Sequence, residues 1–332
     1  MNIYDIAEKA EVSIATVSRI LNQKGNVSPK TKEKVLKVMD EMGYTPNAFA
    51  RALGLDSIKM IGVVCSDVSD IYYAKAVSVI ENELREQGYD AILCCTGTDL
   101  KDKKKAIDVL LSKRVDALIL IGSIFQEHTD NSHIEKAAMS IPVIIINGEY
   151  EFENTYSVKC DEYKAVKDCV VSLSNSGHKD VIYIYNSESF SSINKRKGFL
   201  SGIKSVGIPN GNDLIYKCER TLESVGQTID EIIKSGVKFT AVITSVDLLA
   251  VGAVKALARN GVKVPEEVSV VGFNNSVIAE YSSPTITSID NKVDILCTDA
   301  VRTLLDVFEK KSVARVKTVQ GELVIRESCS HN

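Results

Sequence analysis

Apolar side chains recur every three or four residues in three short stretches near the start of the chain, which predicts three helices. In the first stretch the apolar positions are Ile3, Ile6, Ala7 and Ala10. The second helix is expected to run from Ile14 to about Asn22, with inner positions at Val17, Ile20 and Leu21. The third carries Val35, Val38, Met39 and Met42 and is closed by Gly43. We expect the three helices, with Val12 from the first turn, to share one small core.

A hydroxyl residue precedes each of the last two helices. Ser13 is placed to accept a hydrogen bond from an unpaired backbone amide of the second helix. Ser28 stands likewise before the third, where Pro29 takes the first helical position. Two short helices joined by a tight turn form the helix-turn-helix arrangement of DNA-binding proteins. An ordinary packed helix pair has the same periodicity, so periodicity alone leaves both interpretations open.

The outer face of the second helix favours the DNA-binding interpretation. Its side chains are small or hydrogen-bonding with a single charge, and they are Ala15, Thr16, Ser18, Arg19 and Asn22. Small side chains let a helix approach a DNA groove closely, and hydroxyls and amides can bond phosphates. Arg19 can read a guanine edge in the major groove.

From Met60 onward, short runs that are apolar throughout alternate with helical stretches. The expected strands are 60–65, 91–95, 116–121, 143–146, 181–185, 213–217, 240–243, 268–272, 286–289 and 318–325. The expected helices are 72–88, 99–112, 131–139, 162–175, 191–206, 222–235, 247–260 and 291–309. Such strands imply parallel sheets buried on both faces. The two series predict an α/β fold with two doubly wound subdomains, whose ligands bind beyond the carboxyl ends of the strands.

Composition places the chain among soluble globular proteins, and its 332 residues fit two or three domains. No apolar run approaches the roughly 20 residues of a membrane span, and Asp5, Glu8 and Glu11 interrupt the only candidate signal peptide. We therefore expect a cytoplasmic protein without a membrane partner. The eight cysteines include no Cys-x-x-Cys, which predicts reduced, mostly buried thiols.

The net charge of −4 does not by itself indicate a nucleic-acid partner. Residues 1–56 carry eight Lys and Arg against seven Asp and Glu, a balance of +1. Four lysines nevertheless gather on the third helix, at Lys30, Lys32, Lys34 and Lys37. Because amides, hydroxyls and helix N-termini also contact phosphates, DNA binding remains compatible with this charge. We expect modest non-specific affinity and a need for dimerisation.

Motifs that would indicate catalysis are missing from the sequence. It contains no Gly-x-Gly-x-x-Gly after a strand, no P-loop, no Gly-x-Ser-x-Gly and no His-Glu-x-x-His. His128 and His133 lie in a polar stretch with neither a cysteine nor a third ligand nearby, so a metal site is not expected there. We predict that the protein is not an enzyme and needs no cofactor.

Four motifs near the start resemble the signature of the lac repressor/galactose repressor family of transcriptional regulators. They are Tyr-Asp-Ile-Ala (4–7), Val-Ser-x-x-Thr-Val-Ser-Arg-x-Leu-Asn (12–22), Val-Ser-x-x-Thr (27–31) and Tyr-x-Pro-Asn-x-x-Ala-Arg-x-Leu (44–53). Their order and spacing make chance a poor explanation. Further landmarks are Gly-His-Lys (177–179), Val-Val-Gly-Phe (270–273) and Arg-Glu-Ser (326–328).

The resemblance implies a helix-turn-helix domain at 1–46, a hinge helix and linker at 47–59, and an effector-binding and dimerisation domain at 60–332. This last domain would have the fold of periplasmic sugar-binding proteins. The chain would cross between its subdomains three times. One subdomain would hold about 60–158 and 291–317, the other about 162–289 and 320–328.

The resemblance also implies which residues contact an operator. They are Asn2, Ser13, Ile14, Ala15, Thr16, Ser18, Arg19, Asn22, Ser28, Thr31, Tyr44, Asn47, Ala50 and Leu53. Leu53 would enter the minor groove from the hinge helix, where an apolar side chain can unstack a base step. A helix of about two turns is not stable alone in water, so a flexible tether is the alternative for 47–59.

The effector contacts implied by the resemblance are Ser66, Tyr72, Tyr73, Phe125, Asn147, Lys195, Val246, Asp247 and Asn274. Tyr72 and Tyr73 are equally compatible with core positions at a helix start. Lys195 stands where many members have Arg, and Asn274 where many have Asp. Lysine cannot reproduce the bidentate fork that arginine offers a sugar. We expect a wall with one added cation and few carboxylates. The ligand would be a small carbohydrate-like or anionic metabolite, and an anionic or amide-rich molecule such as a sugar phosphate is favoured over a neutral monosaccharide.

These expectations combine into a DNA-binding transcriptional regulator. It would be an effector-responsive repressor that binds a pseudo-palindromic double-stranded operator as a homodimer. Catabolite-control members of the family resemble this chain at Lys195 and respond to a phosphorylated carrier protein, so a protein corepressor stays open as the alternative. A solute-binding protein for a transporter would lack the first 56 residues and carry a signal peptide, and the sequence contradicts it.

Overall fold

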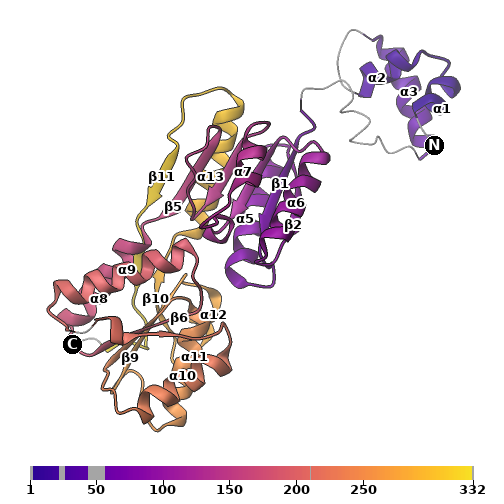
Figure 1. Cartoon of the computed structure of the whole chain (residues 1–332). Helices are drawn as coiled ribbons and strands as arrows, with labels where there is room; N and C mark the ends of the chain where they lie inside the picture. Colours follow the sequence, from indigo (N-terminus) through magenta and orange to yellow (C-terminus); the bar gives the residue numbers. More distant parts are fainter. Residues whose placement is uncertain (1–2, 22–26, 44–56, 210, 331–332) are drawn as a thin grey trace. The chain divides into compact units, whose positions relative to one another are not determined.

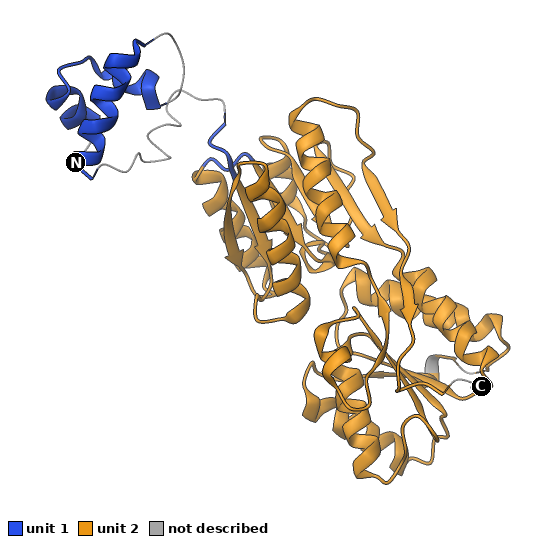
Figure 2. Cartoon of the chain, turned by 180° about the vertical axis from the view of Figure 1, so that it is seen from behind, with its two compact units in different colours: residues 1–60, 114–116 blue, residues 61–113, 117–332 orange. Residues whose placement is uncertain are grey.

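The computed structural model describes residues 3–21, 27–43, 57–209 and 211–330. The chain forms two compact units, coloured separately in Figure 2. The first comprises residues 1–60 with 114–116, and the second comprises 61–113 with 117–332. Among the described residues, no helix combines the length and the apolar character that crossing a membrane requires.

The head is a three-helix unit built as the apolar spacing predicts. Its helices are α1 (Ile3–Lys9), α2 (Ile14–Leu21) and α3 (Pro29–Glu41). The buried core is formed by Ile6, Ala7, Ala10, Val17, Ile20, Val35, Val38 and Met39. Val12, Leu21 and Met42 pack against it, half-buried. All of these positions belong to the stripes that the sequence indicates.

Hydroxyl caps begin the second and third helices. The Ser13 Oγ accepts a hydrogen bond from the Thr16 amide at 3.1 Å, and the Ser28 Oγ accepts one from the Thr31 amide at 3.2 Å. The turn between α1 and α2 places Glu11 in the left-handed region, at φ 51°. The Lys34 ammonium pairs with the Glu11 carboxylate at 2.8 Å and so ties α3 to this turn. Both predicted caps are confirmed.

A single carboxylate holds the segment that leads into the first strand. Asp116 accepts hydrogen bonds from the Ser57 hydroxyl at 2.7 Å, the Ile58 amide at 3.1 Å and the Met60 amide at 3.2 Å. Its own amide donates to the Met60 carbonyl at 2.8 Å. The chain direction is therefore fixed at this point by four hydrogen bonds.

The first lobe of the second unit is a six-stranded sheet covered by helices on both faces (Figure 1). In spatial order its strands are β11 (Val316–Val319), β5 (Thr155–Cys160), β4 (Val143–Ile146), β3 (Ala117–Ile121), β1 (Met60–Cys65) and β2 (Asp90–Cys95). From β11 to β1 all neighbours are parallel. Helices α5 (Ile71–Glu86) and α13 (Val293–Phe308) bury their apolar faces against one side.

Helices α6 (Leu100–Ser112) and α7 (Ser132–Ala138) complete the first lobe. At Gly62 an added Cβ would lie 2.7 Å from the Leu118 side chain and 3.0 Å from that of Leu110 in α6. Glycine at this position therefore lets α6 approach the sheet closely. A short 3-10 turn, η2 (Ser123–Phe125), follows β3.

The second lobe repeats this architecture. Its strand order is β12 (Glu322–Val324), β10 (Thr287–Asp290), β9 (Ser269–Phe273), β8 (Ala241–Thr244), β6 (Val181–Tyr185) and β7 (Ile215–Lys217). Only β12 is antiparallel to its neighbour, with Ile289 opposite Leu323. Helices α8 (Glu162–Asn175) and α9 (Phe190–Ser205) cover one face. Helices α10 (Leu222–Lys234) and α11 (Asp247–Arg259) cover the other, followed by α12 (Val277–Tyr281) and preceded by the 3-10 turn η3 (Gly211–Leu214).

The predicted alternation of strands and helices is confirmed, with three differences, of which the first is the unexpected short helix α12. β5 was not expected, because its polar and apolar residues alternate instead of forming an apolar run. The strand expected at 318–325 is wrong as a single element, since its residues divide between β11 in the first sheet and β12 in the second. Gly321 lies at the break, where an added Cβ would be 2.9 Å from the Ala165 Cβ and 3.2 Å from the Asp290 carbonyl oxygen.

The chain crosses between the two lobes after β5, after β10 and between β11 and β12. Lys292 stands at the second crossing in the left-handed conformation, at φ 60°. Its ammonium pairs with Asp290 at 3.0 Å and with Glu322, beyond the third crossing, at 2.6 Å. Hydrogen bonds to these two carboxylates raise the pKa of Lys292. One side chain thus ties two of the three crossings together.

Candidate functional site

The exposed face of α2 is the first candidate site. Ile14, Ala15 and Arg19 are exposed, while Val17 and Ile20 are buried in the head core. Thr16 and Ser18 lie at the border between the two faces, half-buried. The division into an inner apolar face and an outer small and polar face is therefore confirmed. Ile14 is 42% exposed, an apolar contact surface at the start of the helix.

The predicted contacts Ser13, Ser28 and Thr31 are engaged in helix capping. The Ser13 and Thr16 hydroxyls are 2.8 Å apart, and the Ser28 and Thr31 hydroxyls are 2.7 Å apart. These pairs lie at the N-termini of α2 and α3, where backbone amides favour phosphate oxygens. The remaining predicted DNA contacts lie outside the described residues, and they are Asn2, Asn22, Tyr44, Asn47, Ala50 and Leu53.

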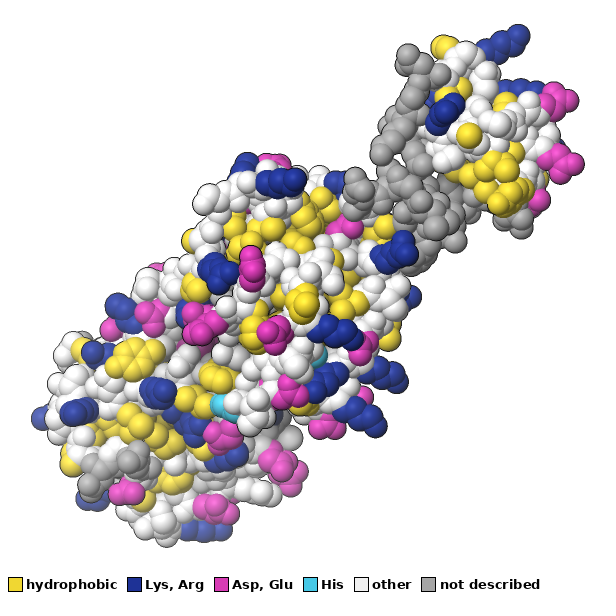
Figure 3. All heavy atoms as spheres, turned by 45° about the horizontal axis from the view of Figure 1, so that its top comes forward, with side chains coloured by type: hydrophobic (Ala, Val, Ile, Leu, Met, Phe, Trp, Pro, Cys, Tyr) yellow, Lys and Arg dark blue, Asp and Glu magenta, His cyan; other side chains and the backbone are white. Residues whose placement is uncertain are grey.

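On the face of the second unit seen in Figure 3, the charged side chains do not form a basic patch that would indicate nucleic-acid binding. Lys and Arg side chains alternate there with Asp and Glu, and neither sign covers a large area. This mixture agrees with the small net charge of the chain.

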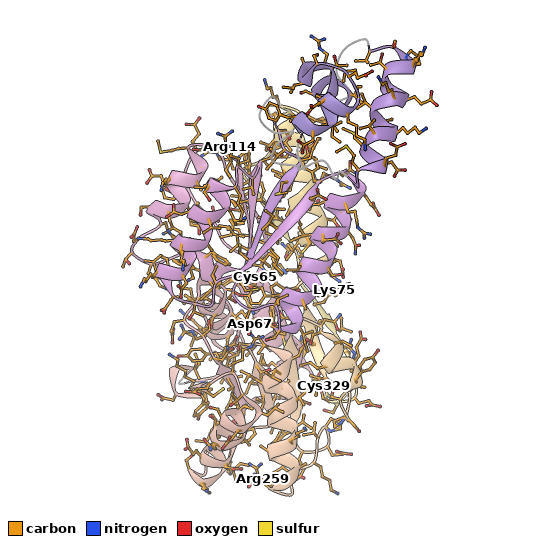
Figure 4. All side chains as sticks on the ribbon, turned by 90° about the vertical axis from the view of Figure 1, so that its right-hand side faces the viewer. Cys65, Asp67, Lys75, Arg114, Arg259 and Cys329 are labelled. Carbon is orange, nitrogen blue, oxygen red and sulfur yellow. The ribbon has the colours of Figure 1, made fainter. Side chains whose placement is uncertain are left out.

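The second candidate site is a cavity of about 350 Å³ between the two lobes. A third of its lining comes from residues that directly follow strands, as expected for doubly wound sheets. Ser66 follows β1, Asn147 follows β4, Ser245 follows β8 and Asn274 follows β9. Figure 4 labels Cys65 and Asp67, which flank Ser66, on the side of the first lobe that faces the second. The volume lies in the range of small-molecule sites, about 300–1,000 Å³.

Seven of the nine predicted effector residues line this cavity. They are Ser66, Tyr72, Tyr73, Asn147, Lys195, Val246 and Asn274. The structure thus brings together predicted residues from both lobes. Phe125 and Asp247 do not belong to the lining, and each has a structural explanation.

Phe125 is fully buried instead of forming a cavity wall. Its carbonyl accepts a hydrogen bond from the Tyr150 hydroxyl at 2.6 Å, and its ring lies 5.8 Å from the buried Lys103 ammonium. The η2 turn rotates its neighbours Ser123 and Ile124 toward the cavity in its place.

Asp247 lies behind the residues that line the cavity and holds them in position. Its carboxylate accepts hydrogen bonds from the Ser276 amide at 2.7 Å, the Ser276 hydroxyl at 2.6 Å and the Ser288 hydroxyl at 2.5 Å. Burial raises the pKa of this carboxyl, and the three hydrogen bonds oppose that shift. Asp247 holds the loop that carries Asn274, and it lines only an adjoining cavity of about 310 Å³.

Lys195 is the buried cation of the cavity. Its ammonium lies 3.6 Å from the centroid of the Phe273 ring and donates to the Ser245 carbonyl at 3.2 Å. The carboxylate of Glu162 lies 3.7 Å away, and Glu162 also accepts a hydrogen bond from Ser191 at 2.5 Å. Burial lowers the pKa of Lys195, and the neighbouring Glu162 carboxylate opposes this shift.

The expected wall with one added cation and few carboxylates is wrong. Two carboxylates, Asp70 and Glu162, line the cavity together with two cations, Lys195 and Arg220, so the formal charges sum to zero. Arg220 pairs with Asp70 across the two lobes. Asp70 is the N-cap of α5, five residues after β1. Glu162 begins α8 two residues after β5, and because β5 was not expected, the strand-end pattern did not indicate it.

Hydroxyls and amides make up most of the remaining lining. Seven serines, one threonine and four asparagines contribute. The Asn147 amide donates to the Tyr72 hydroxyl at 3.0 Å and accepts from the Cys160 amide at 2.9 Å. Within the described part of the chain, the buried Ser192 hydroxyl and Asn291 amide oxygen have no hydrogen-bond partner. These two atoms are available to a ligand with hydroxyl groups.

Other contacts join the lobes beside the cavity. The Ser191 amide of the second lobe donates to the Ser123 hydroxyl of the first at 2.9 Å. The His128 ring stacks on Phe190 at 4.4 Å between centroids, with its Nε2 3.2 Å from the Glu188 carbonyl. His133 is buried in α7 and is not grouped with His128. The described residues contain no cluster of three His, Cys, Asp or Glu side chains that could hold a metal ion.

Comparison with known proteins adds to this geometry. Residues 2–47 match the bacterial regulatory proteins of the lacI family, and residues 170–329 match the periplasmic binding protein-like domain. An HTH-type transcriptional regulator of Lachnoclostridium phytofermentans is 43% identical over 330 residues, 99% of each chain. The regulator DegA of Bacillus subtilis is 33% identical over 331 residues, 99% of this chain and 98% of its own.

A solved structure of similar fold is that of the lac repressor dimer bound to operator and the anti-inducer ONPF. It is 25% identical, with a TM-score of 0.87, and the match covers 99% of this chain and 98% of that one.

Proposed function

Because the chain belongs to the lacI family of bacterial regulatory proteins, which are DNA-binding transcriptional regulators and not enzymes, we propose that it is a ligand-controlled repressor. It binds a pseudo-palindromic operator as a homodimer in the cytoplasm, and a small molecule in the cavity between the lobes changes its affinity for DNA. The domains divide at 1–46, 47–59 and 60–332.

The exposed face of α2 is the observation that supports DNA reading most directly. It presents Ile14, Ala15 and Arg19 outward from a buried core, in the segment that matches the family. Ile14 and Ala15 are suited to thymine methyl groups, and Arg19 to guanine. Ser13 and Ser28 position helix N-termini for phosphates. The proposal also includes DNA contacts from Asn2, Asn22, Tyr44, Asn47 and Ala50, and insertion of the Leu53 side chain into the minor groove.

The ligand is a neutral molecule with several hydroxyl groups, such as a sugar. The charge of Lys195 is offset by Glu162, and that of Arg220 by Asp70, which leaves no uncompensated cation for a phosphate. Hydroxyls and amides in the lining match sugar hydroxyls as donors and acceptors. The aromatic rings of Tyr72 and Tyr73 add flat apolar surface.

Coupling between the cavity and the head follows from population shift. The contacts Ser123–Ser191 and Asp70–Arg220 hold the lobes at one relative angle. A ligand that binds better at another angle shifts the dimer toward that state by its differential affinity. DNA affinity changes only if the two states differ in how they present the paired heads.

Selection of binding sites from random DNA tests the DNA-binding part. We expect enrichment of an inverted repeat with two equal half-sites, and no enrichment with a variant lacking residues 1–59. Enrichment of a single, asymmetric site would contradict binding as a symmetric dimer.

A thermal-shift series with glucose, ribose and their phosphates tests the ligand class. We expect a neutral sugar to raise the unfolding temperature of the wild type more than that of an Asn147→Leu variant. Stabilisation by the phosphates alone would contradict a neutral ligand. Stabilisation by a phosphorylated carrier protein alone would replace the small ligand with a protein corepressor.

A further inference from the structure

Two cysteines lie side by side at the ends of neighbouring strands, each within three residues of a residue that lines the cavity. Cys65 is the last residue of β1 and Cys95 the last of β2, and these strands are neighbours in the first sheet. Their Sγ atoms are 3.7 Å apart. Neighbouring strands lie about 4.8 Å apart, which falls within the Cα separation of about 4.4–6.8 Å that a disulfide spans. The backbone is therefore already in place for a bond between them.

The two thiols differ in their access to solvent. Cys95 is exposed, whereas Cys65 is buried. Burial raises the pKa of Cys65 to about 12, so its thiol is protonated at neutral pH. An oxidant in solution therefore meets Cys95 first, and Cys65 stands behind it as the second sulfur. This is the arrangement of an accessible thiol next to a resolving thiol.

We infer that Cys65 and Cys95 are a peroxide-responsive pair that forms a reversible disulfide between the ends of β1 and β2. The Cys95 thiolate attacks one oxygen of hydrogen peroxide, the O–O bond breaks, and the departing hydroxide takes the thiol proton as water. Cys65 then attacks the resulting sulfenic sulfur. The S–S bond forms, the S–O bond breaks, and a second water leaves with the Cys65 proton. Two thiols are oxidised and one peroxide is reduced, and a cellular dithiol reverses the step by exchange.

The bond is connected to the cavity through the backbone. Cys65 directly precedes Ser66, and Cys95 precedes Thr96, Gly97 and Thr98. The Thr96 amide donates to the Cys65 carbonyl at 3.1 Å, and the Gly97 amide donates to the Ser66 carbonyl at 2.8 Å. Ser66 and Thr98 both line the cavity. A disulfide of about 2.0 Å cross-links these two strand ends and restricts their motion. Oxidation therefore restricts the segments that carry Ser66 and Thr98, and an effect on ligand control rests on the proposed function.

Peptide mapping of the full-length chain tests the thiol pair without any ligand or DNA. After treatment of the reduced protein with a small excess of hydrogen peroxide, we expect free thiols to fall by two from the eight of the reduced chain. A peptide pair linked through Cys65 and Cys95 should appear, and dithiothreitol should remove it. The Cys95→Ser variant should lose this product.

Cys94→Ser is the matched control, because Cys94 is the neighbouring residue on the same strand and its side chain points to the opposite face. This variant should keep the Cys65–Cys95 product. A bond through Cys94, a link between two chains, or sulfinic acid on Cys95 without a disulfide would overturn the assignment. Loss of fewer than two thiols would overturn it as well.

Hydrogen exchange tests the connection to the cavity. In the oxidised wild type, we expect slower amide exchange in peptides covering 66–73 and 96–99, at least several-fold, and no change in oxidised Cys95→Ser. Formation of the disulfide with unchanged exchange in both peptides would overturn the restriction of these segments. Because neither readout involves DNA, failure here is distinguishable from failure of the proposed repressor function.

Discussion

The head and the cavity are assembled from contacts of very different sequence range. Among the described residues of the head, every buried one lies between Ile6 and Met39, and both caps join residues three apart. In the cavity, the ion pairs join Glu162 to Lys195 and Asp70 to Arg220. The head depends on local periodicity. In the cavity, the Asp70–Arg220 pair joins the two lobes, and the Glu162–Lys195 pair joins α8 to α9 within the second lobe. Each region should therefore fail separately when its own contacts are removed.

Removing a core side chain of the head should give the largest effect. Ile6 is fully buried, so Ile6→Ala should cost the head about 3 kcal/mol through lost burial and the cavity left behind. For a unit of this size the loss removes most specific DNA binding. Fluorescence anisotropy with the selected operator measures it. Leu36→Ala, at a 48% exposed position of α3, should bind nearly as the wild type does. Loss of ligand-induced stabilisation by Ile6→Ala would show that the regions are not independent.

Breaking the buried ion pair between Lys195 and Glu162 should have the next largest effect, on the stability of the second unit. Lys195→Met leaves Glu162, which is 5% exposed, without its cation, and Glu162→Gln removes the carboxylate charge. Urea unfolding of both single variants and the double variant should give a coupling of about 2 kcal/mol. Lys164→Met breaks the exposed pair with Asp168 and should change stability little. Additive effects of Lys195→Met and Glu162→Gln would mean that the pair contributes no mutual stabilisation.

Base readout should depend on single exposed side chains of the head. Arg19→Ala should relax the preference at one base pair of each half-site, by about 1–3 kcal/mol. Lys37→Ala, at another exposed cation of the head, should lower affinity evenly across sequences and reduce its salt dependence. Site selection with both variants measures the difference. An unchanged base preference after loss of Arg19 would remove it from the readout.

Lowering the pH should have a smaller effect, and it should reduce the stability of the second unit more than that of the head. Burial lowers the pKa of His133 and of His178 below 6.5, and residues 1–60 contain no histidine. The unfolded chain then takes up protons before the folded one, so the stability of the second unit falls as the pH drops below 6.5. His133→Leu should reduce this loss by on the order of 1 kcal/mol, because both its ring nitrogens are buried without partners among the described residues. Identical pH profiles for the variant and the wild type would contradict this assignment.

The sequence predicts well wherever structure depends on neighbours in the chain. Ser13 and Ser28 cap the expected helices, and most of the fully apolar runs become buried strands. The run at 91–95 is an exception, because β2 lies at the edge of its sheet and is partly exposed. It predicts poorly where distant segments meet. Nothing near Glu162 shows that Lys195 will lie beside it, and nothing in 318–325 shows that the chain changes sheets at Gly321. Asp247 was expected at the ligand because of the family resemblance, but its three hydrogen-bond donors come from Ser276 and Ser288.

The three crossings between the lobes also set the order in which a newly made chain can fold. The described core of the head ends at Met39, whereas the first lobe waits for helix α13 and strand β11, which ends at Val319. At about 5–20 residues per second, synthesis of the intervening chain takes roughly a quarter of a minute to one minute. During that time the nascent chain carries a complete head core and no cavity. A polypeptide released early from the ribosome would therefore have the helices that face DNA without the part that a ligand can control.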